Sequence, residues 1–213
     1  MKLTRPVLPP LGSRKERIVL ASIACILASV PFLIVTFPPI TDLPQHAAQI
    51  RLFGEALSQP DSPYRIQWMT PYSLVYTVLG ASWLAFGPEN AGRIGMLIIA
   101  LLWIAMLHLL AARLSRSPLA ATLASLLFFG HILYWGFYQF AFGWMLFMGW
   151  ILLTQVNFKN RFREAAAFFF ASAVLYFAHV LWFFVAVGWL AAQHILLKPS
   201  WQRTAARLAG AFP

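Results

Sequence analysis

Three polar side chains within residues 38–55 have the types and the spacing that acid–base chemistry requires. Asp42, His46 and Gln49 follow one another at i, i+4 and i+7, so a helix would place all three on one face. A carboxylate at the edge of an apolar environment is a partly desolvated base, which could take a proton from an attacking hydroxyl group. The spacing therefore predicts Asp42 as a catalytic base, with His46 beside it as a substrate-binding residue.

Asp42 also has a purely structural explanation, and the sequence leaves both explanations open. Residues 43–57 repeat apolar side chains at helical spacing, which predicts an amphipathic helix at a membrane surface. Asp42 precedes this helix and Gln45 follows three residues later, which is the pattern of a capping box. Asp42 and His46 supply at most two metal ligands where a zinc site needs three or four, so a zinc site is not expected. No cofactor is expected, with a divalent metal left as an open alternative.

Five further residues are candidates for substrate binding: Arg65, His131, Tyr138, Gln139 and His179. Arg65 has aromatic neighbours and could bind phosphate, or it could anchor the chain to lipid headgroups. The other four gather at two reversals between apolar segments. A tyrosine at that depth belongs to the aromatic belt of a membrane protein, but histidine and glutamine are costly in lipid and should face the bundle interior. We therefore expect these side chains to share one outward-facing cleft with Asp42.

The composition is that of an integral membrane protein. Hydrophobic residues make up 61% of the 213 residues and charged residues only 10%, whereas a soluble domain needs about 25% charged residues to cover its surface. The net charge of +10 comes from short basic clusters between apolar segments. Clusters of this kind flank membrane spans, so we expect membrane lipids as partners and no nucleic acid.

Seven apolar stretches occur, at residues 18–37, 71–86, 91–112, 118–133, 136–154, 164–178 and 180–197. If residues 71–86 do not cross, all but three of the sixteen basic residues fall on one side, as the positive-inside rule demands. The sequence therefore predicts an all-α, polytopic transmembrane helix bundle of about six spans, with outer-leaflet juxtamembrane helices. Its expected location is the inner (plasma) membrane, with both ends in the cytoplasm.

Three regions follow from this arrangement. Residues 1–17 form a basic cytoplasmic N-terminus ahead of an uncleaved signal anchor. Residues 18–197 form the transmembrane bundle, including an outer loop at 38–90. Residues 198–213 form a cytoplasmic tail or the start of a further helix, in a chain that is expected to be incomplete.

The order of these features resembles the N-terminal half of the GT-C integral-membrane glycosyltransferases. A signal anchor is followed by an outer loop with an acid in a D-x-P-x-H motif (DLPQH, 42–46), then by FGPENAGR (86–93), a span and the basic turn ARLSRSP (112–118). The resemblance implies a polyprenyl-phosphate-linked sugar donor and inverting transfer on the outer face, with Asp42 matching the catalytic acid of the first loop. Asp42 has no adjacent second acid of the kind that binds a metal in that family.

Two classes of protein are alternatives to an enzyme. A transporter subunit is disfavoured because no span carries a buried acid or matching pairs of half-helices broken by glycine or proline. A non-catalytic membrane protein or assembly partner remains open, because the chain is short.

Overall fold

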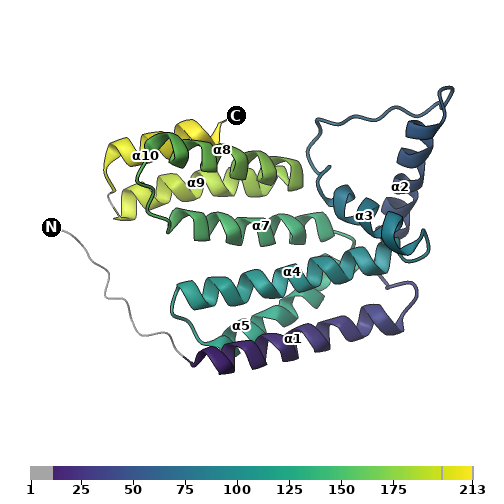
Figure 1. The fold of residues 1–213 in the computed structure, drawn as a ribbon, viewed down its shortest axis with the longest axis horizontal. Helices are drawn as coiled ribbons and strands as arrows, with labels where there is room; N and C mark the ends of the chain where they lie inside the picture. The colour runs from purple at the N-terminus through teal and green to yellow at the C-terminus, as the bar shows by residue number, and fades with distance from the viewer. Residues whose placement is uncertain (1–11, 198, 213) are drawn as a thin grey trace.

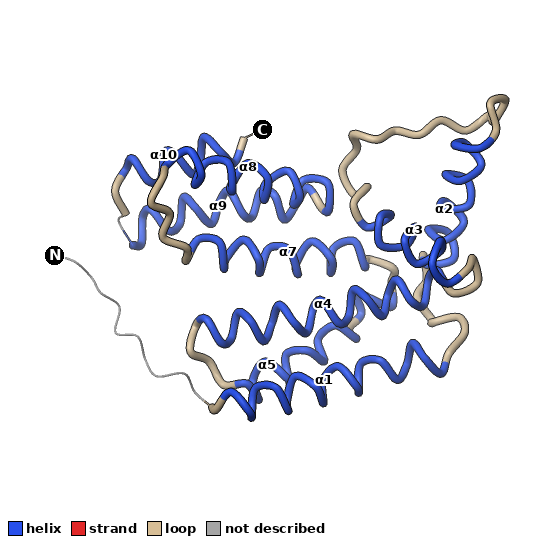
Figure 2. The backbone as a smooth tube through the Cα atoms, in the orientation of Figure 1, coloured by secondary structure: helices blue, strands red, loops and turns tan. Residues whose placement is uncertain are grey.

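A computed structural model describes residues 12–197 and 199–212, and helices joined by loops make up that part of the chain, the longest loop being residues 59–74 (Figure 2). In chain order they are α1 (Arg14–Ile34), α2 (Leu43–Ser58), α3 (Val75–Phe86), α4 (Ala91–Arg113), α5 (Pro118–Ser125), the 3-10 helix η1 (Leu126–Phe129), α6 (His131–Tyr134), α7 (Tyr138–Thr154), α8 (Arg161–Ala178), α9 (Val180–Leu197) and α10 (Trp201–Ala211). The described residues contain no strand, so the predicted all-α class is confirmed.

Local signals explain where several helices begin and end. The hydroxyl of Ser13 accepts a hydrogen bond from the backbone N–H of Glu16 at 3.1 Å, which caps α1. The Asn160 side chain caps α8 in the same way, accepting from the N–H groups of Phe162 and Arg163. His179 adopts an extended conformation that ends α8, and α9 begins at the next residue. The tight reversal that the sequence predicts at His179 is present.

The longer helices and the segment 118–134 run lengthwise, and successive members of this series alternate in direction along the chain (Figure 1). One end of the bundle holds the end of α1, the starts of α4 and α7 and the α8–α9 junction, with α2 and α3 beside them. The opposite end holds the start of α1 and the α4–α5, α7–α8 and α9–α10 connections. The acids between residues 42 and 89 therefore belong to the first end, which we call the α2–α3 end, and most basic residues belong to the other.

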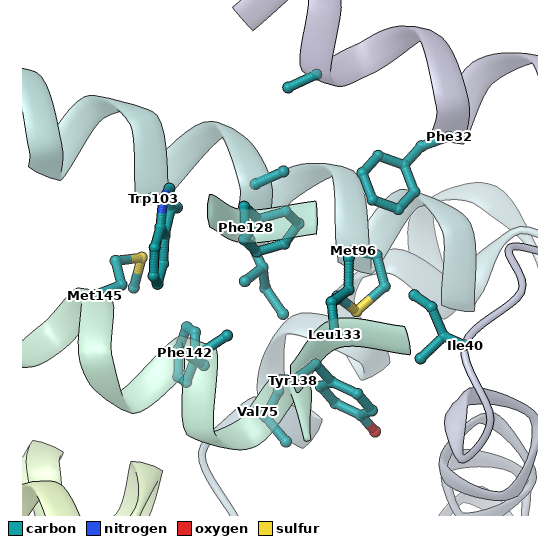
Figure 3. Close-up of a cluster of buried hydrophobic side chains, with 14 of the residues drawn as sticks. Phe32, Ile40, Val75, Met96, Trp103, Phe128, Leu133, Tyr138, Phe142 and Met145 are labelled. Carbon is teal, nitrogen blue, oxygen red and sulfur yellow. The ribbon is translucent and has the colours of Figure 1, made fainter. Parts of the chain in front are cut away.

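Two apolar clusters hold the helices together, and α7 contributes to both. The first cluster joins α1, α3, α4 and α7 and includes Phe32, Met96 and Phe142 (Figure 3). The second joins α7 to α8 and α9 and includes Trp150 and Phe168, whose rings meet edge to face at 4.9 Å. Because α7 packs on both sides, its first residues are held at the α2–α3 end.

Two of the described helices, α1 and α4, are long and apolar enough to cross a membrane. Helices α3, α7 and α9 and the segment 118–134 are apolar but shorter, and α8 opens with charged residues. Large apolar side chains project from the outer faces of the bundle, such as Ile26 on α1, Phe170 on α8 and Phe184 on α9, each more than 60% exposed. The described chain thus contains two helices that qualify as membrane spans by length and composition. Helix length does not establish the six crossings that the sequence predicts.

The C-terminal helix α10 folds back against α8 and α9. Glu164 on α8 is fully buried, and its carboxylate accepts from Arg207 of α10 at 2.8 Å and from Arg161 at 2.6 Å. The Arg207 guanidinium also lies 5.1 Å above the Phe168 ring. A close backbone approach accompanies these contacts, because Gly210 lies directly against the carbonyl of Ala165. Within residues 199–212, the helix α10 occupies Trp201–Ala211.

Candidate functional site

The Asp42 carboxylate does not cap α2, so the capping-box interpretation is wrong. Asp42 occupies the N-cap position, but its side chain makes no capping hydrogen bond. Its backbone is helical (φ −93°, ψ −2°) rather than extended as N-cap residues usually are. Pro44, the second residue of α2, has no N–H to donate, which removes one of the two groups that a cap would satisfy. The carboxylate is therefore not engaged in holding the helix.

Asp42 is held instead against the connection between α6 and α7. The backbone N–H and the hydroxyl of Thr41 both donate to the carbonyl oxygen of Tyr134, each at 3.0 Å. Gly136 has a φ of +92° and lies so close to Asp42 that a Cβ atom at Gly136 would be 2.6 Å from the Asp42 Cβ. Only glycine adopts this conformation without strain and leaves this space. Gly136 therefore sets the position of the half-buried Asp42 side chain.

A hydrogen-bonded group from three helices lies next to Asp42, and we call it the Tyr76 cluster: His46 and Gln49 of α2, Tyr76 of α3 and Gln139 of α7. The Tyr76 hydroxyl donates to the Gln49 side-chain oxygen and lies 2.5 Å from His46 Nδ1. Gln139 is hydrogen-bonded to the same hydroxyl. The cluster connects α2, which extends away from the bundle in Figure 1, to the bundle itself.

Burial keeps the titratable members of the cluster neutral near pH 7. Desolvation lowers the pKa of His46, against the smaller opposing effects of the hydrogen bond with Gln49 and the charge of Asp42. Desolvation also raises the pKa of Tyr76, which the hydrogen bond with Gln139 partly offsets. The charge of Asp42 acts on His46, so the two side chains form one electrostatic unit, as the i, i+4 spacing predicts.

Tyr138 forms the inner wall of this site. It is fully buried, and its ring meets the His46 ring edge to face at 5.0 Å. Figure 3 shows its hydroxyl pointing away from the apolar side chains of Val75 and Leu133. That buried hydroxyl has no hydrogen-bond partner in the described part of the chain. A buried polar group without a partner is costly, so its presence suggests a site that accommodates a polar ligand.

The other predicted residues do not join this group. The His179 ring lies between Tyr72 and Phe140, at 4.8 and 5.4 Å, on a neighbouring side of α7. His131 is exposed, because Gly130 ends the preceding helix in an extended conformation and α6 starts afresh at His131. Arg65 is exposed in residues 59–74, which loop away from the bundle (Figure 1). The expectation that His131 shares one cleft with Asp42 is therefore wrong, and Arg65, for which contact with phosphate or lipid headgroups is expected, lies apart from the Tyr76 cluster.

Within residues 12–197 and 199–212 no three histidine, cysteine or acidic side chains converge as a metal site would require. The site is open to solvent on one side, where Gln49 is exposed.

Sequence reasoning did not find Tyr76 or Gly136. Tyr76 lies within the apolar stretch 71–86 and Gly136 begins the apolar stretch 136–154, and apolar periodicity gives no signal for a site at either residue. No family model, curated protein or solved structure matches this chain.

Proposed function

We propose that this chain is a membrane glycosyltransferase that takes a sugar from a polyprenyl phosphate at the α2–α3 end of the bundle. One observation carries the proposal: the Asp42 carboxylate makes no capping bond and is held by Gly136 beside His46 and the unpartnered Tyr138 hydroxyl. A carboxylate placed in this way is available as a base. The resemblance of DLPQH and the features around it to GT-C enzymes supports the same role.

The proposed placement has six crossings and puts the α2–α3 end on the outer face of the plasma membrane. Helices α1, α4, α7, α8 and α9 and the segment 118–134 would cross, and α2 and α3 would lie in the outer leaflet. The distribution of charge supports this orientation, because the connections at the opposite end carry most of the basic residues. The exposed apolar side chains on the outer helix faces support contact with lipid.

The proposed reaction moves one sugar from the donor to a hydroxyl-bearing acceptor. Asp42 takes the proton of the acceptor hydroxyl, while the oxygen of that hydroxyl attacks the anomeric carbon of the donor sugar. The bond between the anomeric carbon and the phosphate oxygen breaks, and its electron pair leaves with the polyprenyl phosphate. Attack opposite the leaving group inverts the anomeric configuration. Arg65 remains a candidate for contact with the donor phosphate.

The change Asp42→Asn tests this proposal. It keeps the shape of the side chain but removes the proton acceptor, and since Asp42 forms no cap the stability should not change. We expect transfer from a radiolabelled polyprenyl-phosphate sugar, measured on the full-length protein in proteoliposomes, to fall about a hundredfold or more. Asp61→Asn, an exposed acid in residues 59–74, is the matched control and should retain full activity. Normal transfer by Asp42→Asn would remove Asp42 from the mechanism, and a wild-type protein inactive with every donor would favour the non-catalytic alternative.

Single-cysteine labelling tests the proposed placement independently of activity. In a Cys25→Ala background, Asp61→Cys should react with a membrane-impermeant thiol reagent in intact cells. Ser115→Cys and Lys159→Cys, in the α4–α5 and α7–α8 connections, should react only after permeabilisation. Labelling of Ser115→Cys but not Lys159→Cys in intact cells would contradict the six crossings.

A further inference from the structure

The hydrogen bonds of the Tyr76 hydroxyl determine where the proton of His46 lies. A phenol has a single proton to donate, and Tyr76 donates it to the side-chain oxygen of Gln49, which can only accept. The Tyr76 oxygen lies 2.5 Å from His46 Nδ1. Because its proton is already donated to Gln49, this oxygen can only accept a hydrogen bond from His46. The network therefore assigns the imidazole proton to Nδ1.

This assignment gives the other imidazole nitrogen a definite property. A neutral imidazole carries one N–H donor and one acceptor nitrogen, so a proton on Nδ1 leaves Nε2 with a free lone pair. The ring is half-buried, and burial lowers the pKa of His46, which favours the neutral form. The Gln49 oxygen that accepts from Tyr76 also acts on His46, so its contact with the ring lies on the Nδ1 side, and Nε2 is not among the buried atoms without a partner in the described part of the chain. Nε2 is thus open to a ligand.

The surroundings of His46 indicate the chemistry of that ligand. Asp42 lies one helical turn before His46, and its charge acts on the ring. The carboxylate and Nε2 are both acceptors, whereas the Tyr138 hydroxyl, whose ring meets that of His46 at 5.0 Å, is buried without a partner. Two neighbouring acceptors and one spare hydroxyl complement a molecule that carries several O–H groups. An anion would find no positive charge in this group.

We propose that Tyr76 is a positioning residue that fixes the His46 proton on Nδ1, so that Nε2 accepts a hydrogen bond from a second hydroxyl of the acceptor substrate while Asp42 engages the first. The acceptor would therefore be a polyhydroxylated molecule with neighbouring hydroxyls. This role of His46 rests on the proposed transfer reaction, but the position of the proton does not. The Tyr76 cluster also connects α2 to the bundle, so the test must separate proton placement from mechanical support.

Nitrogen NMR of the full chain, labelled with ¹⁵N-histidine and held in lipid nanodiscs, reads the proton position directly. The His46 signals are identified by their disappearance in His46→Gln. We expect an unprotonated Nε2 in the wild type and a partly or wholly protonated Nε2 in Tyr76→Phe, which removes only the acceptor oxygen. Tyr64→Phe, an exposed tyrosine in residues 59–74, makes the same chemical change outside the cluster and should leave the spectrum unaltered. A wild-type Nε2 that carries a proton, or a Tyr76→Phe spectrum identical to the wild type, would overturn the proposal.

Steady-state kinetics test the binding role with a lipid-phosphate sugar donor and a polyhydroxylated acceptor. Tyr76→Phe and His46→Gln should each raise the KM for the acceptor about tenfold, the loss expected for one hydrogen bond, and leave the KM for the donor unchanged. A purely mechanical role would lower the unfolding midpoint without this selective change in KM, and would refute the inference. If the wild type transfers no sugar at all, the proposed function fails, while the NMR measurement still decides the role of Tyr76.

Discussion

Replacing Gly136 by alanine should displace Asp42 without unfolding the protein. The new Cβ would lie 2.6 Å from the Asp42 Cβ and 2.7 Å from one carboxylate oxygen. Carbon atoms in contact prefer a separation of about 3.5–4.0 Å, so the Asp42 side chain must move by about 1 Å. A misplacement of that size costs on the order of a hundredfold in rate when the displaced group takes part in the chemistry. We therefore expect Gly136→Ala to transfer sugar about a hundredfold more slowly than the wild type.

The cost in stability should be much smaller than the cost in rate. An alanine at a φ of +92° is strained by about 1–2 kcal/mol, a fraction of the roughly 5–15 kcal/mol that holds a typical domain together. The assay pairs transfer in proteoliposomes with denaturant unfolding of the same preparation. Unfolding should show a modest shift, with the variant still folded under the conditions of the transfer assay.

Gly54→Ala is the matched control, because Gly54 lies on α2, the helix that follows Asp42, and no atom lies within 4 Å of the added Cβ. It should keep full activity and become more stable by about 0.5–1 kcal/mol, the usual gain in a helix interior. Full activity in a folded Gly136→Ala protein would refute the argument, since Asp42 could then move without consequence. Equal activity losses in both variants would point to a general effect of replacing glycine by alanine.

Three further predictions concern stability and pH, each measured by denaturant unfolding. Glu164→Gln should cost about 3–5 kcal/mol by leaving Arg207 buried without a counter-charge, whereas Glu164→Leu combined with Arg207→Met should recover most of that loss; an equal loss in the double variant would contradict this. Because burial lowers the pKa of His46 below its usual 6.5, the folded state binds fewer protons than the unfolded state, so stability should decline as pH falls from about 6.5 toward the lowered pKa. His46→Gln should flatten that decline, and an unchanged profile would rule out His46 as its source. Gly210→Ala, which forces α10 away from α8, should destabilise by about 1–3 kcal/mol, and Gly188→Ala, with open space around it, serves as its neutral control.

The sequence predicted the helices well because their signals are local. Apolar runs bounded by turn residues place most helix ends within a few residues, and the amphipathic pattern at 43–57 corresponds to α2 at Leu43–Ser58. His131 shows where this reasoning fails. The run 118–133 looks continuous, but the structure divides it into α5, η1 and α6, and the break at Gly130 leaves His131 on the surface. The extended conformation of Gly130 alone turns the His131 side chain outward. The periodicity of apolar residues does not detect such a local break in a helix.

The candidate site was predicted only in part, because its contacts join residues far apart in the chain. The pairing of Asp42 with His46 follows from spacing on one helix. The hydroxyl of Tyr76 and the space left by Gly136 depend on how α3 and α7 approach α2, which local patterns do not specify. The failure of Asp42 to cap α2 has a partial signal within the sequence, since Pro44 lacks one of the two N–H groups from which a cap at Asp42 could accept. The buried pair of Glu164 and Arg207 is likewise a long-range contact.

The dependence of the site on α7 and α8 has a consequence for how the protein matures during synthesis. The residues that hold Asp42 and Tyr76 in place come much later in the chain. The N–H of Thr41, next to Asp42, donates to the carbonyl of Tyr134, and the N–H of Leu74, near Tyr76, donates to the carbonyl of Phe177 at the end of α8. Asp42 and Tyr76 therefore leave the ribosome well before these partners. Until α8 is in place, α2 and α3 lack these anchors, and their polar side chains face water without their final partners. A ribosome-stalled chain that stops before α7 should therefore insert its first helices but lack an assembled site. The order of translation thus delays assembly of the Asp42 site until the later helices of the bundle have been made.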